Sequence, residues 1–147
     1  MPEIVISAAH PSDLTAIRDL ISEAGLPLDG FGGVAADVIV ARDEASIVIG
    51  TASLEHHGRN GLIRSVAVDP AHRGGGVGSA LAGAVEARAL SNGFESVYLL
   101  TETAQRFFSG RGYQVVARDS APGPIAESVE WSQACGVSAI AMMRAVV

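Results

Sequence analysis

A chain of 147 residues is the length of one domain, and it can bury a core without a disulfide or a metal. Apolar residues make up 48% of it, which excludes a disordered chain. Sixteen acidic and ten basic residues give a formal net charge of −6, and this balance argues against nucleic acids or anionic membranes as partners. We therefore expect residues 1–147 to form a single domain.

In the first half of the chain, apolar residues alternate or recur at helical spacing, and turn residues separate the segments. The pattern predicts a strand at 4–9, a helix at 14–24 that Gly25 ends, and strands at 38–41, 46–54 and 62–68. Before the last of these strands, residues 57–61 predict a hairpin turn, because Asn60-Gly61 takes up positive φ angles at low cost.

The second half continues the alternation of helices and strands. It predicts a long helix at about 76–91, a strand at 96–100, a short helix at 103–111, an irregular loop at 121–124, and strands at 113–117 and 137–143. Hairpins make antiparallel pairs and a strand–helix–strand unit makes a parallel one, so the order indicates an α/β fold with a mixed sheet.

Residue types that are missing or rare narrow the chemistry. All ten basic residues are arginine, so no lysine is present to form a Schiff base. The single cysteine, Cys135, cannot form an intrachain disulfide, which suits a reducing compartment. The N-terminus has no signal-peptide pattern, and no apolar stretch is long enough to span a membrane. These features predict a cytoplasmic protein.

The most informative stretch is the glycine-rich turn from Arg73 to Ser79, which lies between a predicted strand and a predicted helix. Glycines let the backbone approach a ligand closely, and a helix N-terminus adds about half a positive charge. The turn therefore suits a phosphate or pyrophosphate. A dinucleotide-binding pattern would need glycine where Ser79 stands, and a Walker A loop would need a lysine.

The remaining pattern, Arg73-x-x-Gly76-x-Gly78, resembles the R/Q-x-x-G-x-G/A signature of acetyl-coenzyme A-dependent N-acetyltransferases of the GCN5-related (GNAT) superfamily. The segment from Ala104 to Tyr113 resembles the A-x-x-x-Y/F-x-x-x-G-F/Y helix of the same superfamily. In many relatives a tyrosine on this helix protonates the departing thiolate. Phe108 stands at that position, so the general acid comes from elsewhere or is water, whereas Phe107 is expected to be a core aromatic.

The resemblance implies a single-domain α/β fold of that superfamily, with a mixed, mostly antiparallel sheet of six to seven strands flanked by helices. It implies acetyl-coenzyme A as the cosubstrate and direct transfer in a ternary complex, which leaves Cys135 to pack rather than to act as a nucleophile. Backbone N–H groups near Ala67-Val68 are the expected donors to the acetyl carbonyl. The residues expected to bind the cofactor are Val66, Ala67, Val68, Arg73, Gly74, Gly75, Gly76, Val77, Gly78, Ser79 and Phe108.

Longer segments are similar to the arsinothricin/phosphinothricin N-acetyltransferases found among arsenic-resistance functions. These segments lie at 24–27, 62–68, 98–104 and 124–139, although Cys135-Gly136 stands where Cys-Pro is expected. The similarity implies an acceptor that is a small amino acid with a second, anionic group. A protein N-acetyltransferase, or an acyl-coenzyme A sensor without turnover, stays an alternative, and a homodimer stays open.

Two residues are candidates for handling such an acceptor. Arg64 alternates with Val66 and Val68, and we interpret it as an anchor for a carboxylate or phosphinate, with a snorkelling edge-strand arginine as the alternative. Glu55 is the predicted general base, acting through water, with a solvated strand-end glutamate as the alternative and His56 as a second candidate base. Neighbouring residues of an extended strand face opposite ways, so Glu55-His56-His57 predicts no metal site.

Overall fold

The computed structural model describes residues 3–31, 35–134 and 138–146 of the chain. The strands are β1 (Val5–Ala8), β2 (Ala36–Arg42), β3 (Val48–His57), β4 (Asn60–Val68), β5 (Ser96–Thr101), β6 (Gln114–Val115) and β7 (Ile140–Ala145). The helices are α1 (Leu14–Glu23), α2 (Val77–Ser91), α3 (Gln105–Ser109) and α4 (Gly123–Ala126), with a π-helix, η4, at Glu130–Ala134. No helix in this described part is long and apolar enough to cross a bilayer.

The strands form one seven-stranded sheet in the order β1-β2-β3-β4-β5-β7-β6. β4 and β5 run parallel, and every other neighbouring pair is antiparallel. The long connection between β4 and β5 contains α2, as a parallel pair requires. The predicted mixed, mostly antiparallel sheet flanked by helices is confirmed.

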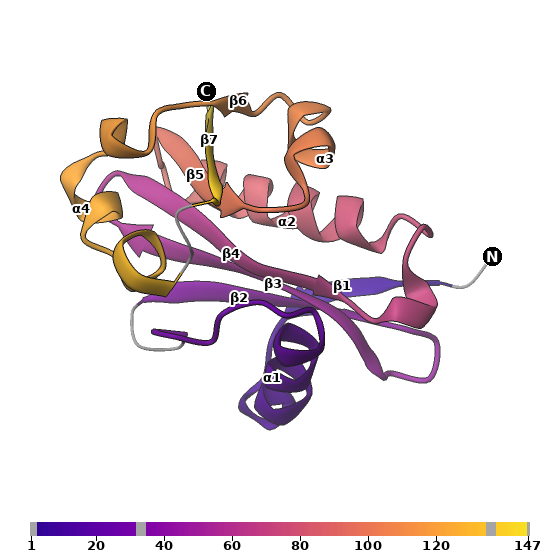
Figure 1. The fold of residues 1–147 in the computed structure, drawn as a ribbon. Helices are drawn as coiled ribbons and strands as arrows, with labels where there is room; N and C mark the ends of the chain where they lie inside the picture. Colours follow the sequence, from indigo (N-terminus) through magenta and orange to yellow (C-terminus); the bar gives the residue numbers. More distant parts are fainter. Residues whose placement is uncertain (1–2, 32–34, 135–137, 147) are drawn as a thin grey trace.

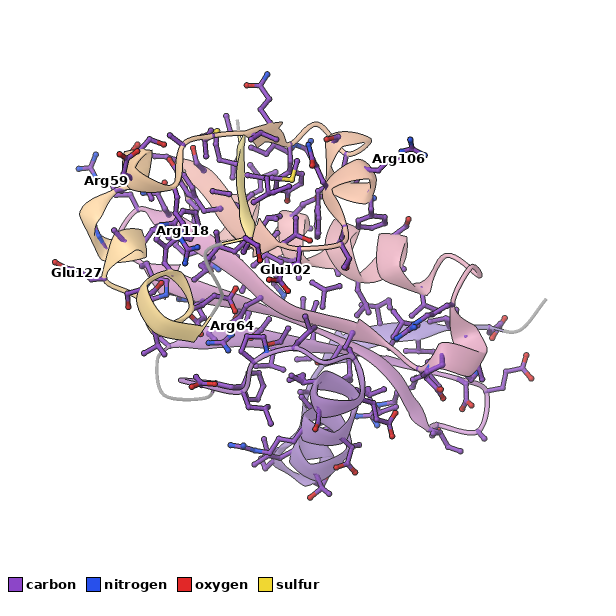
Figure 2. The ribbon with its side chains drawn as sticks, in the orientation of Figure 1. Arg59, Arg64, Glu102, Arg106, Arg118 and Glu127 are labelled. Atoms are coloured by element: carbon purple, nitrogen blue, oxygen red, sulfur yellow. The ribbon has the colours of Figure 1, made fainter. Side chains whose placement is uncertain are left out.

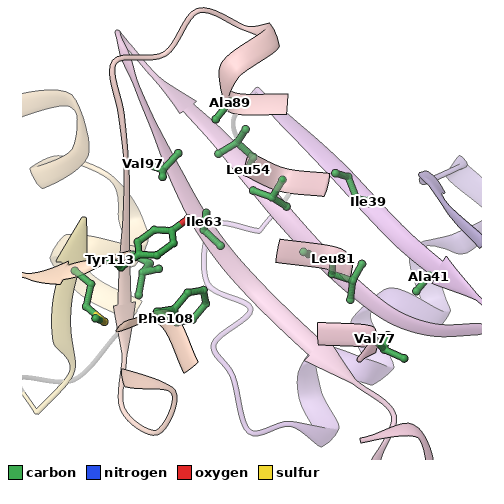
Figure 3. Packing of buried hydrophobic residues seen from close by; sticks show 14 of the residues in the cluster. Ile39, Ala41, Leu54, Ile63, Val77, Leu81, Ala89, Val97, Phe108 and Tyr113 are labelled. Carbon is green, nitrogen blue, oxygen red and sulfur yellow. The ribbon is translucent and has the colours of Figure 1, made fainter. Parts of the chain in front are cut away.

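Helices cover both faces of the sheet, with α1 on one side and α2 on the other (Figure 1). Alternation along β2 explains the division, because Val40 packs with the α1 cluster while Ile39 and Ala41 belong to the α2 cluster. Figure 3 shows the α2 side, where Val77 and Leu81 point into the main core. Phe108 of α3 and Tyr113 pack into the same core, so the C-terminal third of the chain is tied to the central strands.

The hairpin predicted at 57–61 is present, but its turn differs from the expected one, and one further local prediction is wrong. The hairpin turn is Gly58-Arg59, with φ at +68° for Gly58, while Asn60 and Gly61 already belong to β4. Gly61 serves packing instead: a Cβ atom there would lie 2.5 Å from Cδ1 of Leu54. The loop predicted at 121–124 contains the start of α4, because proline suits the first turn of a helix, where no intrahelical N–H bond is lost.

Candidate active site

A cleft opens where two neighbouring strands of the sheet part. β4 and β5 pair over three residues, and the pairing ends at Leu62 opposite Tyr98. Both strands then line a cleft of about 1040 Å³, β4 with Ile63 to Val68 and β5 with Leu99 to Thr101. Because β5 no longer lies beside β4 there, backbone groups on this edge of β4 are available to a ligand in the cleft.

The glycine turn forms one end of this cleft. Gly74 and Gly76 have φ angles of +83° and +87°, which favour glycine. A Cβ atom on Gly74, Gly76 or Gly78 would meet no atom within 4 Å, so the turn leaves room on its open side. The first backbone bond of α2 runs from Ala80 N to Gly76 O at 3.0 Å, so the amides just before Ala80 have no intrahelical acceptor. Together with the helix dipole, they suit an anion.

Most residues predicted to bind the cofactor lie together in the wall of the cleft. These are Val66, Ala67, Val68, Arg73, Gly74, Gly76, Gly78, Ser79 and Phe108. The other two, Gly75 and Val77, do not line it, and the Val77 side chain is buried in the core beneath α2. Arg73 is exposed, and its Nε donates to Val68 O at 3.3 Å, which fastens the turn to the end of β4.

Arg64 points to the face of the sheet opposite to the predicted one. Simple alternation places it with Val66 and Val68, but the register of β4 against β3 shifts by one residue between Arg64 and Ala67. The extra residue makes a β-bulge, at which Ser65 has a φ of +59°. The bulge turns Val66 and Val68 toward α2 and leaves Arg64 on the other face, so the predicted shared face is wrong.

The guanidinium of Arg64 is fully buried and is surrounded by protein oxygens. Its nitrogens approach five of them: Asp29 O at 2.9 Å, Pro27 O at 3.0 Å, Ser65 Oγ at 3.3 Å, Glu130 Oε1 at 3.3 Å and Glu55 Oε2 at 3.4 Å. Two charged partners and several acceptors are what a buried cation needs to offset the loss of water. Arg64 therefore ties β4 to β3, to the loop after α1 and to η4.

Glu55 lies in this cluster, behind the cleft wall. β3 continues past it to His57, whose Nε2 is 2.8 Å from Oε1 of Glu55. The Glu55 side chain is 4% exposed and does not line the cleft. His56 points to the opposite face, as predicted, where its ring packs edge-on against Phe94 and its Nε2 lies 3.1 Å from Asp37. The structure therefore brings Glu55 to Arg64, and it brings neither candidate base to the cleft.

The carboxylates that do line the cleft were not among the predicted site residues. Glu130 comes from η4 and has a side chain that is 5% exposed. Glu102 follows β5, is exposed, and accepts a hydrogen bond of 2.8 Å from Ser138 Oγ. Figure 2 labels Arg64 and Glu102 near the middle of the molecule. π-helices are frequent at functional sites, but no sequence pattern marks this one. Only the structure could therefore show that Glu130 lies in the cleft wall.

The aromatic residues of α3 partly exchange the predicted roles. Phe108 is 5% exposed and packs in the main core while still lining the cleft, as its predicted place requires. Phe107 is 36% exposed and also lines the cleft, so the expectation of a core residue is wrong. Its ring lies edge-on to Phe108, with centroids 5.0 Å apart.

No tyrosine replaces the missing hydroxyl at Phe108. The chain has two tyrosines, Tyr98 and Tyr113, and neither lines the cleft. Tyr113 OH donates to Glu86 at 3.1 Å, and burial together with the Glu86 charge raises the pKa of this phenol well above its usual value. Hydroxyl groups in the cleft wall come from serine and threonine instead. One of these residues, Thr101, accepts from Ala104 N at 2.9 Å, just before α3.

Among the described side chains, no group of three or more His, Cys, Asp or Glu is placed to hold a metal ion. The prediction that Cys135 packs rather than reacts falls on a residue outside those the structure describes.

Residues 35–115, more than half of the chain, match the family model described as acetyltransferase (GNAT) domain. The chain belongs to the GNAT family. The predicted superfamily is therefore confirmed, whereas the arsinothricin subgroup stays a prediction. No curated protein sequence matches significantly.

Solved structures share the GNAT fold over nearly the whole chain. N-acetylglutamate synthase from Neisseria gonorrhoeae, complexed with coenzyme A and N-acetyl-glutamate, has a TM-score of 0.81 at 20% identity. That match covers 99% of this chain and 35% of the synthase, so this GNAT chain spans about a third of that enzyme's length. Rv2747 from Mycobacterium tuberculosis, in complex with CoA and NLQ, has a TM-score of 0.79 at 23% identity, over 97% of this chain and 99% of that one. At these identities the likeness shows the fold.

Proposed function

We propose that this GNAT chain transfers the acetyl group of acetyl-coenzyme A to the amine of a small amino-acid-like acceptor, with both bound at once. The observation that carries the proposal is the cleft between the parted ends of β4 and β5, with the glycine turn at its edge. Two similar structures were solved with coenzyme A, and one of these also holds an N-acetylated amino acid, N-acetyl-glutamate. These likenesses support the donor and the acceptor class.

The turn from Gly74 to Ser79 fits the pyrophosphate of the donor. Its glycines leave open space where side chains would stand, and the helix N-terminus supplies amide donors and a positive dipole end. The unpaired edge of β4 near Ala67 would hold the pantetheine arm and donate to the acetyl carbonyl. When bound, the cosubstrate supplies the activated acetyl group, and the chain's own residues place it beside the acceptor.

No tyrosine lies in the cleft wall to protonate the departing thiolate. Phe108 has no hydroxyl, and Tyr113 is held by Glu86 in the core. We propose that water, or a serine or threonine hydroxyl of the wall, protonates the thiolate, because a thiol with a pKa of about 8.5 is a fair leaving group. Glu55 stays the proposed base, and it would take up the proton through water.

The finer proposal is an acceptor with a second, anionic group, as in arsinothricin or phosphinothricin. It rests on the sequence resemblance alone, since the guanidinium of Arg64, its predicted anchor, is already surrounded by five protein oxygens. An acceptor anion would have to displace one of them. An amine acceptor is therefore the main part of the proposal, and the acceptor panel decides whether the acceptor also needs a second, anionic group.

Thiol release tests this function directly. The protein is mixed with acetyl-coenzyme A and a panel of arsinothricin, phosphinothricin, glutamate, glutamine and simple amines, and the free thiol is measured together with the mass of the product. Acceptor-dependent thiol and an acetylated amine support the proposal. Coenzyme A binding without turnover on any acceptor would favour the alternative of an acyl-coenzyme A sensor. The lack of a tyrosine in the cleft wall is the observation that supports this alternative.

A further inference from the structure

A buried charge cluster lies at the wall of the cleft, with two carboxylates around one arginine and His57 against Glu55. Arg64 lies between Glu55, at 3.4 Å, and Glu130, at 3.3 Å. All three side chains are at most 5% exposed. The exposed Glu102 is a further carboxylate that lines the same cleft.

Cations and anions are unevenly distributed along the cleft. Arg73 and His72 line it beside the glycine turn, where an anionic pyrophosphate suits them. Arg64 pairs with Glu130, and its charge is shared between two carboxylates. The turn therefore favours an anion, and the wall that contains Glu130 favours a cation.

Glu130 is the buried carboxylate that reaches the cleft. It comes from η4, one turn beyond α4, and Trp131 beside it packs edge-on against Tyr98, with centroids 6.1 Å apart. Arg118 donates to Trp131 O at 2.7 Å and so fixes the backbone of this turn. A π-helix held in place by these contacts sets Glu130 in one position in the wall.

We infer that Glu130 binds the ammonium of the acceptor and that Arg64 is a positioning residue, which holds Glu130 and the loop after α1 in place. The inference rests on the proposed function and names the group of the acceptor that the protein recognises. A carboxylate in a wall shielded from water binds an ammonium more strongly than an exposed one does. The acceptor amine thereby lies in the same cleft as the parted edge of β4.

The test compares Glu130→Gln with Glu127→Gln, which removes the same charge from an exposed residue at the end of α4 (Figure 2). The acceptors are the best substrate of the panel and its analogue in which an amide replaces the second anionic group. Glu130→Gln should raise the KM of both acceptors by about 10- to 150-fold, as expected for a lost charge-assisted bond. Coenzyme A affinity, measured by calorimetry, should stay near wild type, whereas the melting temperature should fall, because Arg64 loses one of its two charged partners. Glu127→Gln should change none of these.

Arg64→Lys distinguishes positioning from direct binding. If Arg64 acts through Glu130, the variant weakens both acceptors equally, and its effect is not additive with Glu130→Gln. A loss confined to the anionic acceptor would instead make Arg64 the anion anchor and overturn the positioning role.

Two further outcomes would also overturn the inference: an unchanged KM in Glu130→Gln, or a joint fall in coenzyme A affinity and melting temperature. A wild-type protein that acetylates no acceptor is a separate result, because it refutes the proposed function before any variant is compared.

Discussion

Gly76 and Gly78 occupy the turn for two different physical reasons. Gly76 has a φ of +87°, so any side chain there strains the backbone, whereas Gly78 lies within the first turn of α2 and has only open space beside it. Gly78→Val therefore tests the space for the ligand without backbone strain. We expect both Gly76→Val and Gly78→Val to weaken coenzyme A binding by tenfold or more, about 1.4 kcal/mol, and Arg73→Ala to weaken it less.

Calorimetry with coenzyme A measures these affinities. Gly123→Val is the matched control, because Gly123 also has open space at its Cβ but lies on α4, away from the cleft. Unchanged affinity in both turn variants would refute the placement of the pyrophosphate.

Phe108→Tyr tests whether the chain works without a phenolic acid. The Phe108 ring lies 5.3 Å from that of Tyr113 in the core and borders the cleft, so a hydroxyl can be added with little change in volume. We expect the rate to change by less than tenfold, and the wild-type rate to rise with pH without a loss through a pKa near 10. The pH–rate profile provides the measurement. A positioned general acid usually raises the rate by about 10²- to 10⁴-fold. A gain of that size in Phe108→Tyr would mean that the natural protein is slower because it lacks a phenolic acid at this position.

Tyr113→Phe is the control for that profile. Its hydroxyl binds Glu86 and does not line the cleft, so its removal should leave the pH dependence unchanged. A high-pH loss of rate that disappears in this variant would identify Tyr113 as the acid and contradict its placement in the core, away from the cleft.

At the scale of the elements, Asp13 joins the start of α1 to β2. Its carboxylate accepts from Arg42 at 2.5 Å and from His10 N at 2.8 Å. The hydrogen bond from Arg42, followed by that from His10 N, holds the pKa of Asp13 below its ordinary value. The carboxyl group of Asp13 has a lower pKa in the folded state than in the unfolded state. Its hydrogen bonds therefore stabilise the fold above about pH 4, and this stabilisation is lost as the pH falls through the pKa of the folded state.

Asp13→Asn should therefore lower the free energy of unfolding at neutral pH, and the gap from wild type should close at acid pH. Urea unfolding at several pH values measures this gap. Asp19→Asn, an exposed change on the same helix, is the control. A gap that stays constant down to pH 2 would contradict the role assigned to the ionised carboxylate.

The elements that the sequence predicts best are those whose signals are local. Glycines at both ends bound α2, with Gly76 before it and Gly93, at φ +75°, after it, and its buried face follows the helical period. The face of Arg64 could not be predicted, because one extra residue at Ser65 reverses the alternation without a glycine or proline to mark it. Glu130 comes close to Arg64 only after the chain folds, because the two residues are 66 positions apart in the sequence.

At the scale of the whole molecule, one core joins both sides of the parted sheet. Leu54 and Ile63 of the central strands, Val97 of β5, Phe108 of α3 and Met142 of β7 belong to the same buried cluster (Figure 3). Since the core continues across the point where β4 and β5 separate, the chain should not unfold in two parts. This supports the proposal of a single domain.

Coenzyme A should therefore shift one cooperative unfolding transition of the entire protein. A ligand that binds only the folded state contributes about 2.7 kcal/mol when its concentration is 100 times its Kd. With about 2.1 cal/mol/K of unfolding entropy per residue, this corresponds to a rise of about 5–10 °C in the melting temperature of a chain of this size. Calorimetric scans of wild type and Gly78→Val with and without coenzyme A measure the shift, and the variant should lose most of it. Two separate transitions, of which only one responds, would contradict the single domain. An equal shift in Gly78→Val would show that the ligand binds away from the turn.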